Sequence, residues 1–394
     1  MRVGTATSIR YSSPLYPCLF RLRLCSTRPP IVGMQGAPTF EFGPVPVDFE
    51  DRVYGTSAAF SLGPNTVGVL GSDADYREVL LTVTLRDPGA GEVVPTIHSK
   101  QTGCKTALTG MVAVRVGPSV YCYGGRSRSH YYSSQLREYH LDTGTWKTLG
   151  GISAKTAETE AKHREYLERC DDFSKGTVRD TAGYWPSPRE GCVAGCLGGR
   201  LFIAGGQGDK QSFNETWWYD PTLGSRWQRG EDLPASLATQ TVLRTQRGDE
   251  RVFSQQNVSS VVVGDTLHCV CADQRHMAYT VHQGESVPRG VWSEQATLPQ
   301  IGMWGCVTAI GYRQQYLAVV GGRVRHQKGT VYDLDACEWV EEGRWWEGVR
   351  GAPYVREGSA CVFAGTGNAH TQHLLMVDDG AGIHVVTAVW WDSR

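Results

Sequence analysis

A pattern of glycine, tyrosine and tryptophan recurs three times in this 394-residue chain and constrains its fold more than any other feature. In each copy an apolar segment ends in Gly-Gly, a Tyr follows further along the chain, and a Trp follows shortly after the Tyr. The three copies are Gly124, Gly125, Tyr139 and Trp146; Gly205, Gly206, Tyr219 and Trp227; and Gly321, Gly322, Tyr332 and Trp339. Because the order is the same and the spacing nearly the same in all copies, we expect one supersecondary unit used several times.

Three weaker copies fill the gaps between these motifs. They are the apolar runs 66–71, 266–270 and 374–377. Each of the six runs closes with a residue pair, Gly-Gly in the three clear copies, and the first residues of these pairs are at positions 71, 124, 205, 271, 321 and 378. Three of the five steps between these ends fit a unit of about 50 residues, and the steps that end at 205 and 271 are longer. We therefore predict insertions in the two long intervals, at 151–185 and 238–252. Within the first, residues 154–172 carry acid–base pairs four residues apart, which is typical of a short helix.

The repeated unit resembles the kelch repeat, in which an apolar strand ends in Gly-Gly and the next two strands carry the Tyr and the Trp. The composition agrees with such an all-β fold, because 47 Gly suit tight turns and 12 Trp and 17 Tyr suit pleated, half-buried surfaces. The resemblance implies a kelch-type β-propeller of the class that includes galactose oxidase. It covers residues 38–394 and assigns the glycine, tyrosine and tryptophan of each motif a structural role.

Six blades follow from the spacing, and the last lacks one strand in its own stretch of chain. Residues 38–46 read as a strand, so we expect the N-terminal strand to complete the last blade and close the ring, which removes the exposed sheet edges. The predicted blades are 54–97, 104–150, 186–234, 253–298, 303–344, and 355–391 together with 38–46.

Residues 1–37 form an N-terminal extension of different composition. The first 40 residues contain no Asp or Glu and carry five Arg, at positions 2, 10, 21, 23 and 28. This composition is typical of a mitochondrial presequence, although a disordered tail or a start at Met34 would also account for it. A secretory signal is disfavoured because Pro17, Arg21 and Arg23 interrupt the apolar stretch. We therefore expect a cytoplasmic or mitochondrial protein that is not secreted.

Several function classes are disfavoured by charge and motif content. The formal net charge is −1, and no apolar run approaches the ~18 residues that a membrane span requires, so we expect neither nucleic acid nor membrane as a partner. The 12 Cys include no Cys-x-x-Cys pair and are interpreted mainly as small buried side chains, with disulfides and a metal site as the alternatives. Residues 142–146 fall one residue short of a sialidase Asp-box. The sequence therefore predicts no catalytic residue, no metal and no cofactor.

One face of the predicted ring is rich in arginine and histidine. The link between the second and third strands of a blade, and the link to the next blade, emerge on the same face. Gly-Gly-Arg-x-Arg occurs on that face in the second and fifth blades, which lie opposite each other in a six-bladed ring. The candidate binding residues are Arg126, Arg128, His130, Tyr131, Arg275, His276, Arg323, Arg325 and His326. Arginine suits bidentate contact with carboxylate or phosphate, whereas the alternative is an ordinary solvated loop.

A second recurrence precedes two of the innermost strands. Pro188-Arg189-Glu190-Gly191 is echoed by Arg356-Glu357-Gly358, and in kelch repeats such arginines serve packing between blades. The favoured function is a scaffold that binds an acidic segment of a partner protein, or an anionic ligand, on the arginine-rich face. The alternative is a kelch-type sugar mutarotase or epimerase acting on an anionic sugar such as sialic acid.

Overall fold

The computed structural model describes residues 39–45, 56–63, 65–86, 94–104, 107–127, 131–151, 185–208, 212–224, 226–234, 241–244, 250–253, 259–271, 275–282, 289–298, 306–310, 316–320, 330–340, 360–368, 371–378 and 382–391. All regular secondary structure in these residues is β-strand, and they hold no helix that could cross a membrane. The N-terminal extension at 1–37 and the helix predicted at 154–172 lie outside the described residues.

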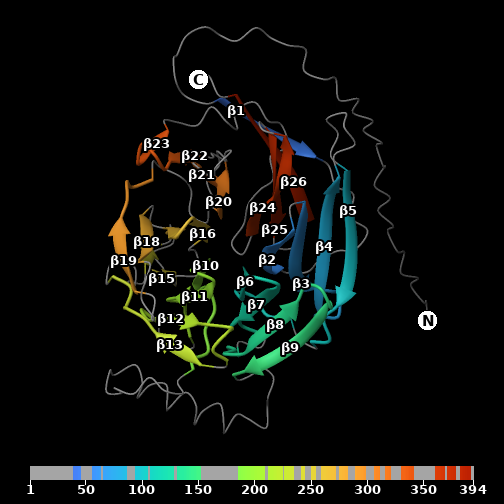
Figure 1. The fold of residues 1–394 in the computed structure, drawn as a ribbon, viewed down its shortest axis with the longest axis vertical. Helices are drawn as coiled ribbons and strands as arrows, with labels where there is room; N and C mark the ends of the chain where they lie inside the picture. Colours follow the sequence, from blue (N-terminus) through green and yellow to red (C-terminus); the bar gives the residue numbers. More distant parts are fainter. Residues whose placement is uncertain are drawn as a thin grey trace, which may run out of the picture.

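The strands form six four-stranded antiparallel sheets, which we number 1 to 6 (Figure 1). Sheet 1 contains β2 (Thr56–Gly63), β3 (Thr66–Ser72), β4 (Glu78–Arg86) and β5 (Val94–Gln101). Sheet 2 contains β6 (Val112–Val116), β7 (Ser119–Tyr123), β8 (Leu136–His140) and β9 (Thr145–Gly150). Sheet 3 contains β10 (Val193–Leu197), β11 (Arg200–Ala204), β12 (Thr216–Tyr219) and β13 (Trp227–Arg229).

The second half of the chain continues the pattern. Sheet 4 contains β16 (Ser259–Val263), β17 (Thr266–Val270), β18 (His276–His282) and β19 (Arg289–Glu294). Sheet 5 contains β20 (Cys306–Ile310), β21 (Tyr316–Val320), β22 (Thr330–Asp333) and β23 (Glu338–Val340). Sheet 6 contains β24 (Ala360–Asn368), β25 (Thr371–Asp378), β26 (Gly382–Trp391) and the N-terminal β1 (Thr39–Val45). A two-stranded hairpin, β14 (Thr241–Arg244) and β15 (Glu250–Phe253), lies in the interval where the sequence predicted the second insertion.

The sheets are arranged around a common axis, with the first strand of each sheet innermost (Figure 1). Each inner strand contacts the inner strand of the next sheet, in the order β2, β6, β10, β16, β20, β24, and β24 contacts β2. At the other end of sheet 6, β1 pairs with β26 from Thr39 opposite Trp391 to Val45 opposite Val385. The predicted all-β propeller is therefore confirmed.

Short hairpins at the inner strands set up this arrangement. In sheets 2, 3 and 4 the first two strands are joined by two residues, and in sheet 3 these are Gly198 and Gly199, with φ of 55° and 74°. Two residues with positive φ match the turn whose twist suits antiparallel strands, and glycine adopts them without a steric penalty.

The Tyr and Trp of the repeat face each other across the last two strands of a sheet. Tyr139 is directly opposite Trp146 in sheet 2, with ring centroids 4.9 Å apart. The pairs Tyr219–Trp227, Tyr279–Trp292 and Tyr332–Trp339 repeat this contact at 5.3, 4.9 and 4.9 Å. Their spacing along the chain is therefore the spacing of cross-strand neighbours around a hairpin, and each pair adds aromatic packing to the sheet.

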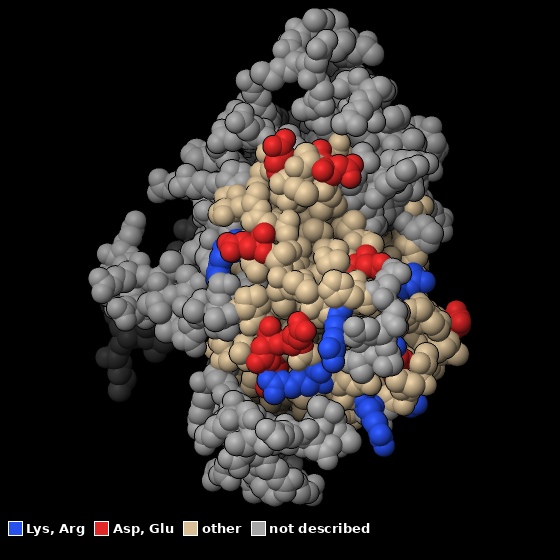
Figure 2. All heavy atoms as spheres, turned by 60° about the vertical axis from the view of Figure 1, so that its left-hand side comes forward, with Lys and Arg blue, Asp and Glu red and all other residues tan. Residues whose placement is uncertain are grey.

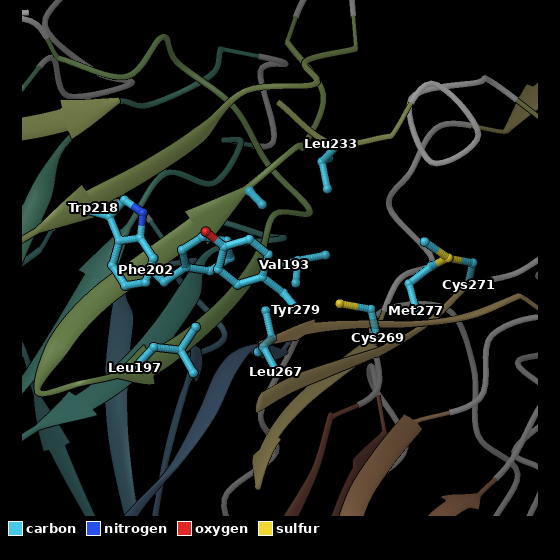
Figure 3. Close-up of a cluster of buried hydrophobic side chains, with 11 residues drawn as sticks. Val193, Leu197, Phe202, Trp218, Leu233, Leu267, Cys269, Cys271, Met277 and Tyr279 are labelled. Carbon is cyan, nitrogen blue, oxygen red and sulfur yellow. The ribbon is translucent and has the colours of Figure 1, made fainter. Parts of the chain in front are cut away.

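The apolar core lies between neighbouring sheets. Between sheets 3 and 4, Phe202 stacks on Tyr279 at 4.8 Å and meets the Trp218 ring edge-on at 4.7 Å (Figure 3). Leu197 and Leu267 complete this contact and are fully buried. Large flat side chains fill the wedge between two sheets that radiate from one axis, so each sheet depends on its neighbour for burial.

Candidate binding face

The face of interest is the one where the second strand of each sheet connects to the third and the fourth leads into the next sheet; we call it the loop face. Antiparallel order places both kinds of link at the same end of every sheet. The loop face is described best in sheets 1 to 3, where residues 73–77, 107–111, 124–127, 131–135 and 205–215 contribute, the last without 209–211.

Two equivalent rows of three residues cross the loop face of sheets 2 and 3. In sheet 2, Arg126 bridges Thr109 on one side and Tyr132 on the other. The same bridges in sheet 3 join Gln207 to Glu190 and to Ser212. Arg126 and Gln207 each follow directly after a Gly-Gly, so the residue after this pair occupies the same place in both sheets.

An ion pair ties the two rows together. The Arg126 guanidinium crosses from sheet 2 to Glu190 of sheet 3, with 3.0 Å between Nε and Oε1. Glu190 is 3% exposed and the Arg126 side chain 30%. The guanidinium also lies 5.9 Å from the centre of the Tyr132 ring. Arg126 therefore holds two sheets in register while part of it still faces solvent.

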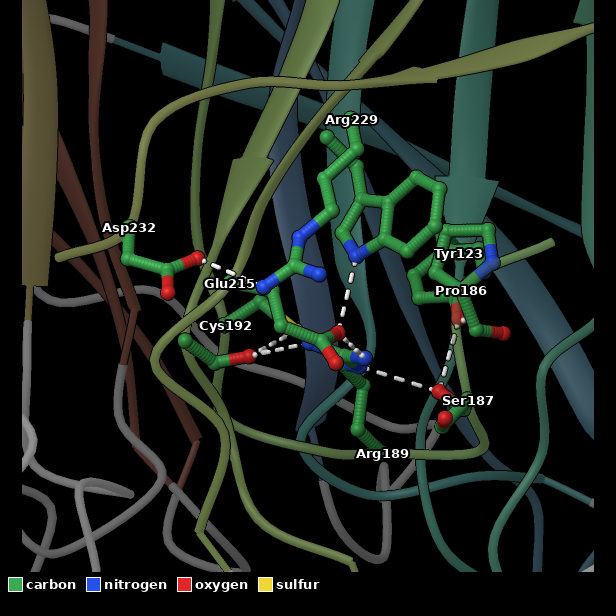
Figure 4. Close-up of polar contacts among 10 residues, drawn as sticks. Tyr123, Pro186, Ser187, Arg189, Cys192, Glu215, Arg229 and Asp232 are labelled. Carbon is green, nitrogen blue, oxygen red and sulfur yellow. Dashed lines mark hydrogen bonds and ion pairs between the residues drawn. The ribbon is translucent and has the colours of Figure 1, made fainter. Parts of the chain in front are cut away.

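The residue before Glu190 is a fully buried arginine, Arg189, whose polar contacts are drawn in Figure 4. Arg189 donates from Nε to the carbonyl of Ser187 at 2.9 Å, from Nη1 to the carbonyl of Gly205 at 3.0 Å, and from Nη2 to Glu215 Oε2 at 2.6 Å. Its guanidinium also stacks on the Phe213 ring, 3.8 Å from the centre. Arg189 thus fixes the chain entering β10 and both ends of the β11–β12 link.

The surroundings of Arg189 and Glu215 set the charge state of this ion pair. Burial alone would raise the pKa of Glu215, but the charge and hydrogen bond of Arg189 and a hydrogen bond from Trp217 Nε1 lower it more, so the pKa lies below its usual value of 4.5. Burial alone would lower the pKa of Arg189, and the Glu215 charge reverses this. Both groups stay ionised at neutral pH.

A second buried ion pair joins sheets 1 and 2. Arg137 on β8 makes two parallel hydrogen bonds to Glu78 at the start of β4, at 2.6 and 2.7 Å, and its Nη1 also lies 2.7 Å from Cys104 Sγ. Sequence reasoning missed this pair. No local signal could have found it, because β8 also carries Glu138 and His140 and its partner strand lies in another sheet.

The predicted binding residues fall into three groups. Tyr131 is 40% exposed on the loop face, where its backbone pairs with Ser127, and Arg275 is half-buried at the end of the β17–β18 link. His276 is instead buried in the interior. The predicted residues Arg128, His130, Arg323, Arg325 and His326 lie outside the described residues.

His276 lies in the interior between sheets 4 and 5. Its side chain is fully buried, its Nε2 lies 3.0 Å from Nδ1 of His268, and its ring meets the edge of Tyr332 at 4.6 Å. Burial lowers the pKa of His276 to about 3 and that of His268 to about 4. The expectation that His276 belongs to an exposed basic surface is therefore corrected, because its side chain points from β18 into the neighbouring sheet.

Comparison with known proteins agrees with the propeller fold. A family model described as the kelch motif matches residues 188–234, which cover sheet 3 and the Arg189 segment. A solved structure titled "Structure of YjhT" superposes with a TM-score of 0.52 over 88% of this chain and 97% of that one, at 12% identity. The chain is a β-propeller with a kelch motif. No curated protein matches its sequence.

On the side where sheets 3, 4 and 5 lie, acidic and basic side chains of the described residues are interspersed (Figure 2). Among the described residues, no three His, Cys, Asp or Glu side chains group in a way that could hold a metal ion.

Proposed function

We propose that the six sheets are the six blades of one closed ring, with β1 as the fourth strand of the last blade. The pairing of β1 with β26 and the contact of β24 with β2 support this. We further propose that the chain is a binding platform and not an enzyme. In this proposal the loop face holds an acidic segment of a partner protein or an anionic ligand.

The observation that carries the proposal is the Arg126–Glu190 pair, whose glutamate directly follows the buried Arg189. Charged groups here hold loops in fixed positions, and a pre-ordered surface loses little conformational entropy when a partner binds. Tyr131 adds an exposed aromatic ring on the same face, and such residues are frequent anchors of protein interfaces.

The ion pair also limits what Arg126 does alone. Glu190 offsets much of its charge, so binding of an acidic segment requires other arginines of the same face. In the proposal these are Arg275 and the loop residues Arg128, Arg323 and Arg325. Several weak attractions around the common axis of the sheets then act together on one partner.

The test is a pull-down followed by a titration with the recovered partner. Arg126→Gln combined with Arg323→Gln should weaken binding more than about tenfold, because about 1.4 kcal/mol is one decade. Glutamine is preferable to alanine at position 126 because it leaves Glu190 with a hydrogen-bond donor. The matched control is Arg115→Gln, because Arg115 is exposed and its side chain bonds the carbonyls of Leu62 and Gly117 on the opposite face.

Two outcomes would contradict the platform. Unchanged partner recovery with the double variant would mean that the arginines are solvated loop residues. Faster anomer exchange of sialic acid with the wild-type protein would favour the sugar mutarotase suggested by the sequence.

A further inference from the structure

The row in sheet 3, unlike the row in sheet 2, contains buried side-chain oxygens that make no hydrogen bond to the described residues, and this points to a ligand. Glu190 and Gln207 exchange both backbone hydrogen bonds at 2.9 Å, and Gln207 bridges Ser212 on its other side. Directly bridged residues project their side chains to the same face, so a carboxylate, a carboxamide and a hydroxyl stand side by side. The equivalent row of the preceding sheet consists of Thr109, Arg126 and Tyr132.

Two oxygen atoms of the sheet 3 row are buried without a hydrogen bond. They are Oε1 of Gln207 and Oγ of Ser212, and neither has a partner in the part of the chain that the structure describes. Both residues are otherwise half-buried, so the row lies near the surface and not in the core. A buried polar atom without a partner costs free energy, and two neighbouring ones on a loop face suggest that a ligand supplies what is missing.

The charge of the row selects the class of ligand. Glu190 is already paired with Arg126, so the local charge is balanced. A buried ammonium group would add an unbalanced positive charge next to Arg126, and a carboxylate would bring no donor to Gln207 Oε1 and would face Glu190. The missing partner is therefore neutral and offers at least one donor.

The two oxygens differ in the hydrogen bonds they can make, and this difference narrows the class of ligand further. Gln207 Oε1 only accepts, whereas Ser212 Oγ–H also donates. A primary carboxamide carries a C=O and an N–H that point the same way, so one group can serve both atoms. A trans peptide unit points its C=O and N–H in opposite directions and can serve only one.

We propose that Gln207 and Ser212 form a pocket for the carboxamide of an asparagine or glutamine side chain in the bound segment. The carboxamide N–H donates to Gln207 Oε1, and its C=O accepts from Ser212 Oγ. The proposal rests on the platform function and makes its recognition more specific: acidic residues contact the arginines, and an amide residue nearby occupies the pocket.

The test uses two small probes, N-acetyl-asparagine N-methylamide and the matching aspartate compound, titrated against the full chain by ligand-observed NMR. We expect the asparagine probe to bind and the aspartate probe to bind at least about fivefold more weakly, in line with one lost hydrogen bond. Gln207→Met and Ser212→Ala should each weaken binding of the asparagine probe by a similar factor. Gln228→Met, the same substitution on outer strand β13 of the same sheet, should not.

Thermal stability supplies a second readout. If Gln207 Oε1 and Ser212 Oγ form hydrogen bonds only with a ligand, then Gln207→Met and Ser212→Ala remove unsatisfied atoms from the free protein. Tm should then stay the same or rise. A fall in Tm with both variants would mean that structural water or the fold itself uses these atoms, and the proposal would be wrong. Equal binding of both probes, or no binding of either, would also overturn it. Neither result affects the arginine test, which reads partner capture by a different part of the face.

Discussion

Arg189 and Glu215 form an ion pair inside sheet 3, with 2.6 Å between Nη2 and Oε2 and the arginine completely buried. The pair connects the chain entering the innermost strand β10 to the chain entering β12. Glu190 follows Arg189 directly, so the position of the partly buried Arg126–Glu190 pair on the loop face depends on the fully buried Arg189. The candidate binding surface is thus an extension of the folded core and not a loop added to it.

Removing one partner of this pair should be costly. Glu215→Ala leaves the Arg189 charge buried and unpaired, and we expect a loss of about 3–5 kcal/mol in the free energy of unfolding. The control is Asp232→Ala, which breaks the exposed Arg229–Asp232 pair and should cost less than about 1 kcal/mol. Urea unfolding of both variants measures the difference, and similar losses would contradict the role assigned to Arg189.

Gly124 should be intolerant of any side chain. Its φ is +76°, and a Cβ there would lie 2.4 Å from the backbone oxygen of Arg189. Gly117 has a similar φ of +57° but open space around it. Gly117→Ala should therefore lower the free energy of unfolding by about 1–2 kcal/mol, because alanine must adopt the left-handed conformation. Gly124→Ala should lower it clearly more, because a neighbouring backbone must also move. Calorimetric melting of both variants tests this, and equal shifts would mean that the contact is absent.

The buried histidine pair should make the protein sensitive to mild acid. The pKa values of His268 and His276 are lowered by burial to about 4 and about 3, while the unfolded chain takes up these protons near 6.5. The unfolded state therefore binds more protons below pH 6.5, and stability should fall as the pH drops from there towards 4.

The matching variant is His268→Leu combined with His276→Phe, which keeps an apolar interior without titrating groups. Its Tm should change less than that of the wild type between pH 6.5 and 4.5. Replacement of the exposed His282 by Gln should leave the wild-type pH profile unchanged. Parallel profiles for the wild type and the double variant would show that other groups govern acid sensitivity.

The N-terminal strand should contribute to the stability of the whole ring. Removing residues 1–48 deletes β1 and leaves the backbone of β26 unpaired along seven positions. Removing residues 1–33 leaves β1 in place. We expect a lower Tm and stronger aggregation for the longer deletion only, because it exposes a sheet edge. Identical melting of the two proteins would exclude a closing role for β1.

The repeat could be recognised from the sequence because its signals are local. The distance from Tyr139 to Trp146 is that of cross-strand partners around one hairpin, and the Gly-Gly pairs mark the ends of the second strands. These features need only neighbouring strands, so spacing along the chain predicts them. The strand at 38–46 was also predictable, because the last repeat was one strand short.

The binding face was only partly predictable for the opposite reason. Arg126 and Glu190 are 64 residues apart, and Arg137 and Glu78 are 59 apart, so no local pattern indicates that they pair. His276 follows the same strand end as Arg275, but alternation along β18 directs its side chain into the next sheet.

The sequence by itself determined the unit of this protein: its length, its strands, its turn glycines and its Tyr–Trp pairs, all of which depend on residues close along the chain. Only the tertiary structure decided which charged side chains are buried as pairs, which face solvent, and which polar atoms of the loop face are left without partners. The physical reason is that burial and ion pairing between sheets depend on how whole sheets pack around the axis, and that packing brings together residues whose separation in sequence carries no signal.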